Sequence, residues 1–151
     1  MSHLKPVNKF LCLQTLCESN FRKLLRLIPH LPALDKNSIA HMGDKPALHL
    51  SVHEKAPYTL ILELSYYFEV EPQPLFEPAL KLRVYLDAGM VEVLSDCERP
   101  RKRWQGPMDQ QMLEHKWRLN YFLDKWLDHC LHHGYRFSAV DGDLQTVFAN
   151  A

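Results

Sequence analysis

Between residues 47 and 94, apolar and polar side chains alternate along much of the chain, and this alternation constrains the fold more than any other feature. Successive side chains of a β-strand point to opposite faces, so the pattern predicts strands with one apolar and one polar face. We expect four strands, at residues 47–53, 58–68, 80–87 and 90–94. An antiparallel meander fits their order, and its apolar face needs a second layer to cover it.

The segments between these strands carry turn residues. Residues 69–79 are rich in proline and acidic side chains, and we expect a loop there because proline has no backbone N–H to donate to a neighbouring strand. Ala88-Gly89 fits a two-residue hairpin loop. That loop would place Tyr85 opposite Glu92 and would keep polar side chains on one face of the hairpin.

Two segments with helical periodicity flank the strands. Between Phe10 and Ile28 the apolar residues fall on one stripe of a helix, and Pro29 ends it. A longer helix is predicted from Asp109, which can cap its first turn, to just before Gly134, which suits a helix C-terminus. Each helix therefore has an apolar side that can cover the sheet.

The predicted fold is α+β: an N-terminal helix, a four-stranded antiparallel meander and a long C-terminal helix, arranged as a two-layer sandwich. Residues 135–140 could add a short fifth strand. We expect a single domain over residues 1–151, with its core at about 10–140 and a loosely held tail at 141–151.

Composition narrows the classes of function. Eighteen Lys and Arg residues balance eighteen Asp and Glu residues, so net charge predicts no general attraction to nucleic acid or to anionic lipid. The four cysteines form no C-x-x-C pair, the first ten residues lack a secretory signal, and no apolar run approaches the roughly 18 residues that span a bilayer. We expect a cytoplasmic protein with reduced thiols and no membrane association.

One candidate site is the polar face of the sheet. Alternation and the hairpin bring together a guanidinium, a phenol and two carboxylates, from Arg83, Tyr85, Asp87 and Glu92. Such a group could bind an anion or transfer a proton, although solvated sheet faces are commonly polar for solubility alone. No glycine-rich phosphate loop accompanies it, and we expect no cofactor.

A second candidate lies on the predicted C-terminal helix. Trp117 and Tyr121 are four residues apart on the side away from the apolar stripe, with Leu113 nearby. Large aromatic side chains on a solvated face often mark interfaces, here with an unknown protein or with a second copy. Alternatively, the tail from Tyr135 onward, including Phe137 and Phe148, could fold back and cover them.

A third candidate is a basic segment with one aromatic residue: Arg99, Arg101, Lys102, Arg103 and Trp104. It could contact RNA phosphates and stack on a base. A short charged loop is the commoner explanation of such a segment, and the chain carries no recognised nucleic-acid-binding motif. An RNA-associated function therefore stays a minor alternative.

Two further features have structural explanations. His129 and His133 are four residues apart and could chelate a metal, but the dipole favours histidines at a helix C-terminus and no third ligand stands out, so we expect no metal site. Asn20 falls within the apolar stripe of the first helix and must find hydrogen-bond partners there. We expect it to hold a loop near residues 54–59.

Several motifs, in order along residues 10–134, resemble those of the YqiB-like bacterial proteins, a family whose function is unassigned. They are Leu16-Cys17-Glu18-Ser19-Asn20-Phe21, Leu24-Leu25-Arg26-Leu27-Ile28-Pro29, Glu54-Lys55-Ala56-Pro57-Tyr58-Thr59, the hairpin from Arg83 to Val93, Lys116 with Asn120, Trp126-Leu127, Cys130-Leu131 and His133-Gly134. The resemblance implies a genomic setting beside enzymes of nucleotide turnover.

Taken together, the sequence predicts a small protein that acts by binding, as an interaction or regulatory module, and it leaves open whether the protein is an enzyme. The C-terminal helix around Trp117 and Tyr121 is its expected contact with another protein. A nucleotide-like small ligand, or an enzymatic reaction, at the polar sheet face remains the alternative.

Overall fold

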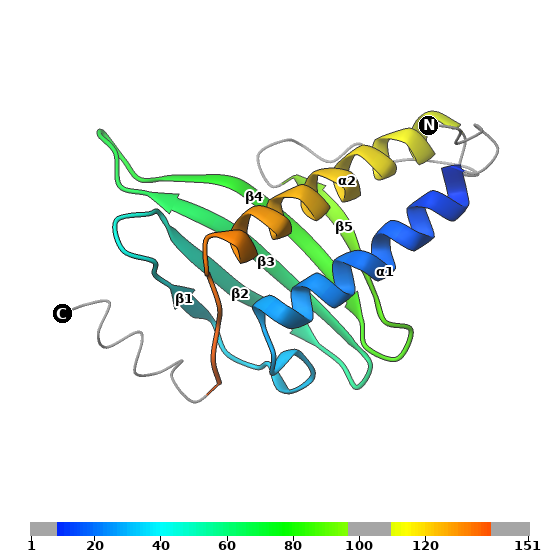
Figure 1. Cartoon of the computed structure of the whole chain (residues 1–151), viewed down its shortest axis with the longest axis horizontal. Coiled ribbons are helices and arrows are strands. Elements are labelled where there is room, and N and C mark those ends of the chain that lie inside the picture. Colours follow the sequence, from blue (N-terminus) through cyan, green and yellow to red (C-terminus); the bar gives the residue numbers. More distant parts are fainter. Residues whose placement is uncertain (1–8, 97–109, 140–151) are drawn as a thin grey trace.

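A computed structural model describes residues 9–96 and 110–139 and contains one antiparallel sheet with two long helices on one of its faces (Figure 1). The helical elements are α1 (Lys9–Leu27), the short 3₁₀ helix η2 (Leu31–Ala33) and α2 (Gln110–His132). The strands are β1 (Ser38–Ala40), β2 (Ala47–Lys55), β3 (Thr59–Phe68), β4 (Leu75–Tyr85) and β5 (Met90–Asp96). The predicted α+β sandwich is confirmed.

The strands lie in the order β1-β2-β3-β4-β5, each antiparallel to the next. The four predicted strands correspond to β2–β5, whereas β1 was not predicted because three residues are too few to show a period. The short strand considered at 135–140 is wrong, because residues 135–138 adopt no strand conformation. Instead, the backbone N–H of Phe137 donates to the carbonyl of Leu27 at 2.8 Å, which ties this segment to the end of α1.

The proline-rich loop is shorter than predicted. Strand β4 begins at Leu75, and the ladder pairs Phe76 with Tyr67 and Ala79 with Ser65. The register shifts between these two pairs, where two residues of β4, Glu77 and Pro78, lie opposite the single residue Tyr66 of β3. A bulge of this kind accommodates a proline that cannot donate to the ladder, which is why the strand continues through it.

The β4–β5 hairpin has a longer turn than the sequence predicted. Tyr85 pairs with Met90, so the turn has four residues, and Glu92 pairs with Arg83 instead of with Tyr85. The predicted register is therefore wrong by two residues. A shift of two keeps every side chain on its predicted face, because the strand period is also two. Gly89 allows this turn by adopting a φ of 69°.

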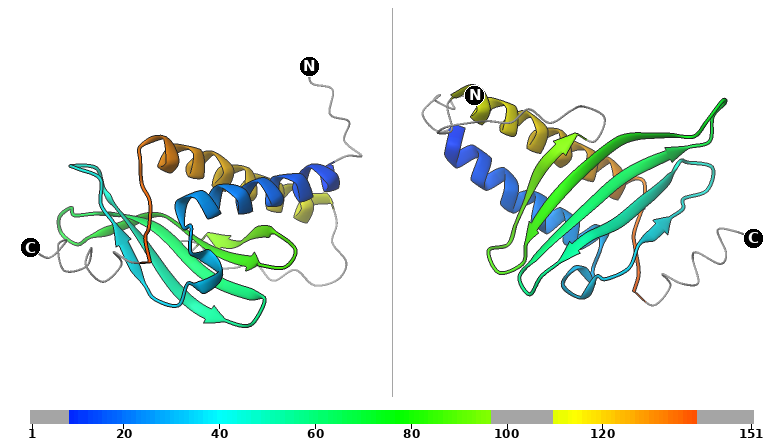
Figure 2. Two further views of the ribbon diagram at one scale, coloured as in Figure 1. Left: turned by 60° about the horizontal axis from the view of Figure 1, so that its bottom comes forward. Right: turned by 180° about the vertical axis from the view of Figure 1, so that it is seen from behind.

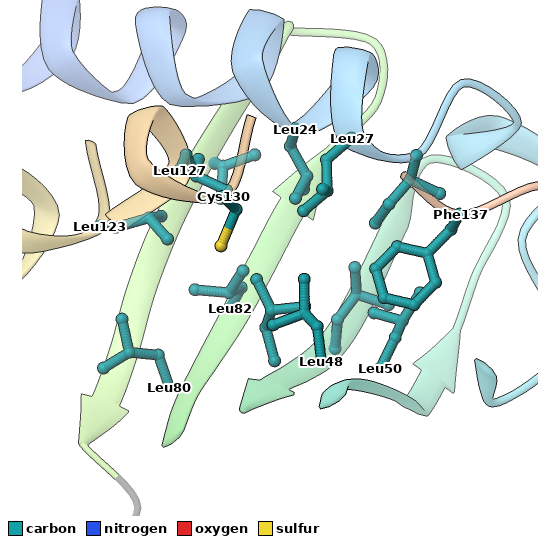
Figure 3. Packing of buried hydrophobic residues seen from close by; sticks show 14 of the residues in the cluster. Leu24, Leu27, Leu48, Leu50, Leu80, Leu82, Leu123, Leu127, Cys130 and Phe137 are labelled. Carbon is teal, nitrogen blue, oxygen red and sulfur yellow. The ribbon is translucent and has the colours of Figure 1, made fainter. Parts of the chain in front are cut away.

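The helices α1 and α2 lie side by side and run in the same direction (Figure 1). Both cover the same face of the sheet, so that in the view from behind the sheet lies in front of the two helices (Figure 2). Their apolar sides meet the leucine-rich face of the sheet (Figure 3). Fully or almost fully buried side chains there include Leu24, Leu27, Leu48, Leu50, Leu80, Leu82, Leu123, Leu127, Cys130 and Phe137. In the described part of the chain, no helix is both long and apolar enough to span a membrane.

Asn20 lies in the contact between the two helices. It is completely buried, and its Nδ2 donates to the backbone carbonyl of Asn120 at 3.1 Å. The expectation that Asn20 holds the segment near residues 54–59 is therefore wrong. Because α2 packs against α1, the helix backbone supplies an acceptor for the amide nitrogen, while the buried Oδ1 of Asn20 has no hydrogen-bond partner among the residues that the structure describes.

Candidate functional site

A pocket of about 330 Å³ opens between the first half of α1, the β4–β5 hairpin and the first half of α2. In Figure 1, both helices extend past β5, the outer strand of the sheet, so that the sheet does not underlie their first turns. The volume lies within the range of small-molecule sites. The lining residues are Leu13, Gln14, Cys17, Tyr85, Ala88, Met90, Glu92, Lys116 and Asn120.

A carboxylate with two partners forms the polar side of this pocket. Glu92 accepts a hydrogen bond from the Tyr85 hydroxyl on Oε1 at 3.0 Å, and Lys116 Nζ donates to its Oε2 at 2.6 Å. The ammonium and the carboxylate are each about one-quarter exposed and neutralise each other. We call these three residues, Tyr85, Glu92 and Lys116, the pocket cluster.

Two buried side chains, one from α1 and one from α2, also line the pocket. Asn120 Oδ1 accepts the backbone N–H of Val93 at 3.0 Å, and its Nδ2 donates to the carbonyl of Lys116 at 2.8 Å. The Cys17 thiol lies 3.8 Å from the same Oδ1. The amide of Asn120 is therefore fixed by the protein itself, and it connects both helices to the outer strand of the sheet.

The structure brings together three of the four predicted sheet-face residues. Arg83 is paired with Glu92 across the hairpin, and a hydrogen bond with Tyr85 raises the pKa of its guanidinium. Asp87 is exposed, and its Oδ1 accepts the backbone N–H of Ala88 within the turn. Only Tyr85 and Glu92 of the four line the pocket.

Sequence reasoning missed the helical half of the pocket. Lys116 and Asn120 are four residues apart and share one side of α2, which is a usable signal, but their partners Glu92 and Val93 lie more than 20 residues away. No local pattern encodes which strand a helix will pack against. The contribution of α1 through Cys17 is non-local for the same reason.

The predicted partner-binding residues lie along the outer side of α2. The rings of Trp117 and Tyr121 stack with centroids 4.9 Å apart and planes inclined by 11°. Tyr121 is 43% exposed, while Trp117 and Leu113 are partly exposed. We call these three residues the α2 aromatic surface.

The described part of the C-terminal segment packs away from this surface. The hydroxyl of Tyr135 donates to the carbonyl of Pro46, and Phe137 is buried beside Leu27, near the end of α1. Phe137 therefore does not cover Trp117 or Tyr121. Residues 140–151, including Phe148, lie outside the described residues.

The other sequence candidates are placed as follows. His129 and His133 have ring centroids 4.3 Å apart. Within residues 9–96 and 110–139, no group of three or more His, Cys, Asp or Glu side chains could hold a metal ion. The basic residues Arg99, Arg101, Lys102 and Arg103, together with Trp104, lie outside the described residues.

The buried thiols of Cys17 and Cys130 should resist alkylation in the folded protein. Burial raises the pKa of each to about 11, and the thiolate is the nucleophile. At pH 7.5 we expect iodoacetamide to leave both unmodified when peptides are analysed by mass spectrometry, with the rate rising as pH approaches 11. Labelling in urea provides the control, and native labelling of Cys17 at the rate of a free thiol would contradict the expectation.

Comparison with known proteins confirms the family resemblance. A family model described as "Protein of unknown function (DUF1249)" matches residues 23–136. The uncharacterised protein YqiB of Escherichia coli K12 is 29% identical over 124 residues, which cover 79% of this chain and 86% of the relative. YqiB proteins of Escherichia coli O6:H1 and O157:H7 match equally well. No solved structure matches the chain.

Proposed function

The chain belongs to the DUF1249 family of proteins of unknown function, and from this premise we propose that it is a single-domain protein-binding module that docks a partner protein on the α2 aromatic surface. The stacked rings of Trp117, which is partly exposed, and Tyr121, which is 43% exposed, carry the proposal. Exposed aromatic side chains are unfavourable in water and are enriched at interfaces. We further propose a cytoplasmic location, which the free thiols of Cys17 and Cys130 support.

The rest of α2 leaves this side of the helix available for a partner. Leu123, Leu127 and Cys130 are fully buried in the core, so the opposite side of the helix already has a structural role. Because Trp117 and Tyr121 stack on each other, little side-chain entropy remains to be lost when a partner covers them. A preordered aromatic pair of this kind is typical of the residues that dominate binding energy.

The charges beside the surface favour an acidic partner. Arg118 and Lys125 are exposed on α2, and the ammonium of Lys125 lies 5.2 Å from the ring centroid of Tyr121. A partner that presents an apolar anchor flanked by Asp or Glu would complement both the rings and the basic residues. In a symmetric dimer this surface would meet its own copy, and the same basic charges would then repel.

Alanine at both Trp117 and Tyr121 should remove partner binding and leave the fold intact. The stacking of the two rings is worth about 0.5–1.5 kcal/mol beyond the apolar area that they bury. Because Trp117 is only partly buried and Tyr121 is exposed, the total loss in unfolding free energy should leave the protein folded. A tagged protein would first retain its partner from the native cytoplasm. With the purified partner, we expect at least about tenfold weaker affinity for the double variant, because central aromatic residues carry much of an interface's binding energy.

Matched variants separate this surface from the rest of the helix. Phe122→Ala removes an aromatic side chain that is 45% exposed and about 100° further round α2, and it should not change the affinity. Arg118→Glu should weaken binding, whereas Lys55→Glu, the same charge reversal on β2, should not. The proposal would be overturned by any of three results: the wild-type protein retains no partner, the double variant binds the partner as tightly as the wild type does, or the retained partner is a second copy of this chain.

A further inference from the structure

The pocket between α1, α2 and the β4–β5 hairpin is a separate feature from the α2 aromatic surface. Its polar side chains are those of the pocket cluster together with Gln14 and Asn120, and the lining surface is mostly apolar, with Leu13, Cys17 and Met90 contributing. A volume of about 330 Å³ is large enough for a small molecule, and a ligand can enter because the pocket opens to solvent. An apolar cavity of this size gains contacts when a ligand of matching shape enters it.

The charges of the pocket are already compensated. Lys116 Nζ and Glu92 Oε2 are 2.6 Å apart, and the second carboxylate oxygen accepts the Tyr85 hydroxyl. An incoming anion would meet the carboxylate of Glu92, and an incoming cation would meet the ammonium of Lys116. Either would also lose its hydration against apolar walls without gaining an unpaired counter-charge.

Hydrogen-bonding capacity nevertheless remains at one end. An ammonium has three N–H donors, and Lys116 uses one of them on Glu92. The carboxylate of Glu92 has further lone pairs beyond the two that are used. A neutral hydroxyl or carbonyl group could therefore join the cluster without breaking the ion pair.

We infer that this pocket binds an uncharged, mainly apolar small molecule, with one hydrogen-bonding group at the Lys116–Glu92 pair and its apolar body against Leu13 and Met90. This ligand class differs from the anionic, nucleotide-like ligand that the polar residues of the hairpin suggest when α2 is left out of consideration. The difference arises from α2, which supplies Lys116 and so neutralises Glu92.

Three probes with the same eight-carbon chain test the inference on the full-length protein. They are 1-octanol, octanoate and octylamine, which are neutral, anionic and cationic at pH 7. We expect 1-octanol to raise the melting temperature, since binding to the folded state alone stabilises it, and to bind at least about tenfold more tightly than either charged probe in calorimetry. Equal binding of a charged probe, or no binding of 1-octanol, would overturn the inference.

Two charge-switch variants sharpen the test. Glu92→Gln keeps an acceptor for Tyr85 but leaves Lys116 without its counter-charge, so octanoate should bind about tenfold more tightly than it binds the wild type. Lys116→Met removes the only cation among the described residues that line the pocket, since Arg83 lies beside Glu92 but does not line it, so the affinity for octylamine should rise in the same way. These gains of binding require folded variants, and an unchanged preference in both would contradict a neutralised site.

A bulky residue at the pocket mouth locates the binding. Ala88 is exposed in the hairpin turn and lines the pocket, so Ala88→Trp should block 1-octanol without disturbing the core. Ala33→Trp, at an exposed alanine of η2 near the opposite end of α1, is the matched control and should bind 1-octanol normally. If Ala88→Trp binds as well as the control does, the ligand occupies another part of the molecule and the inference fails.

Discussion

Replacing Phe137 with alanine should lower the free energy of unfolding by about 3–5 kcal/mol, which is the usual cost of truncating a buried phenylalanine. Its ring is completely buried and belongs to the core cluster, where it lies beside Leu48 and Leu50 (Figure 3). The substitution keeps the backbone hydrogen bond to Leu27, so the loss of unfolding free energy measures the contribution of the phenylalanine ring alone. Urea unfolding followed by circular dichroism measures the change.

The matched control is Phe76→Ala, which removes the same ring from an exposed position. Phe76 is 45% exposed and contacts His49 and Tyr67 on the sheet face away from the helices. We expect a loss of about 1 kcal/mol or less there, as for most surface substitutions. Equal losses for the two variants would mean that residues 135–139 are not part of the core.

Replacing Asn120 with alanine should cost about 2–4 kcal/mol of unfolding free energy. The amide is completely buried and provides the acceptor for Val93 N–H and a donor to the Lys116 carbonyl. Without it, the N–H of Val93 is left buried and unpaired, which alone costs about 1–3 kcal/mol. The small cavity left by the side chain adds to this loss.

A second substitution separates hydrogen bonding from volume. Asn120→Leu has a similar size but equally lacks the acceptor, so it should lose about as much stability as Asn120→Ala. Gln111→Ala, at an exposed residue of the same helix, should change stability little. If leucine restores wild-type stability, packing alone accounts for the role of Asn120, and its hydrogen bond to β5 contributes little.

Periodicity predicted most of the fold because it is a local property of the chain. The stripe of Phe10–Ile28 became α1, and the alternating segments became β2–β5. Segments too short to show a repeating pattern were missed, as the three-residue strand β1 was. Proline and turn rules were less reliable, since Pro78 was accommodated in a bulge and the hairpin took a four-residue turn.

The candidate site was predictable only in part. Alternation placed Tyr85 and Glu92 on one face, and the error of two residues in register did not separate them, because the Tyr85 hydroxyl still reaches Glu92. Helical geometry likewise placed Trp117 and Tyr121 together, as their stacking confirms. Their roles in binding stay predictions.

What the sequence determined by itself follows from spacing along the chain: the helices, the alternating strands, and which residues share one face of an element. What only the tertiary structure decided is which faces meet. The parallel packing of α2 on α1 carries Lys116 to Glu92 and Asn120 to Val93, over separations of 24 and 27 residues. These contacts arise because the helices and the strands bury their apolar faces against one another. Every element contributes to that burial, so no local sequence pattern predicts which faces meet.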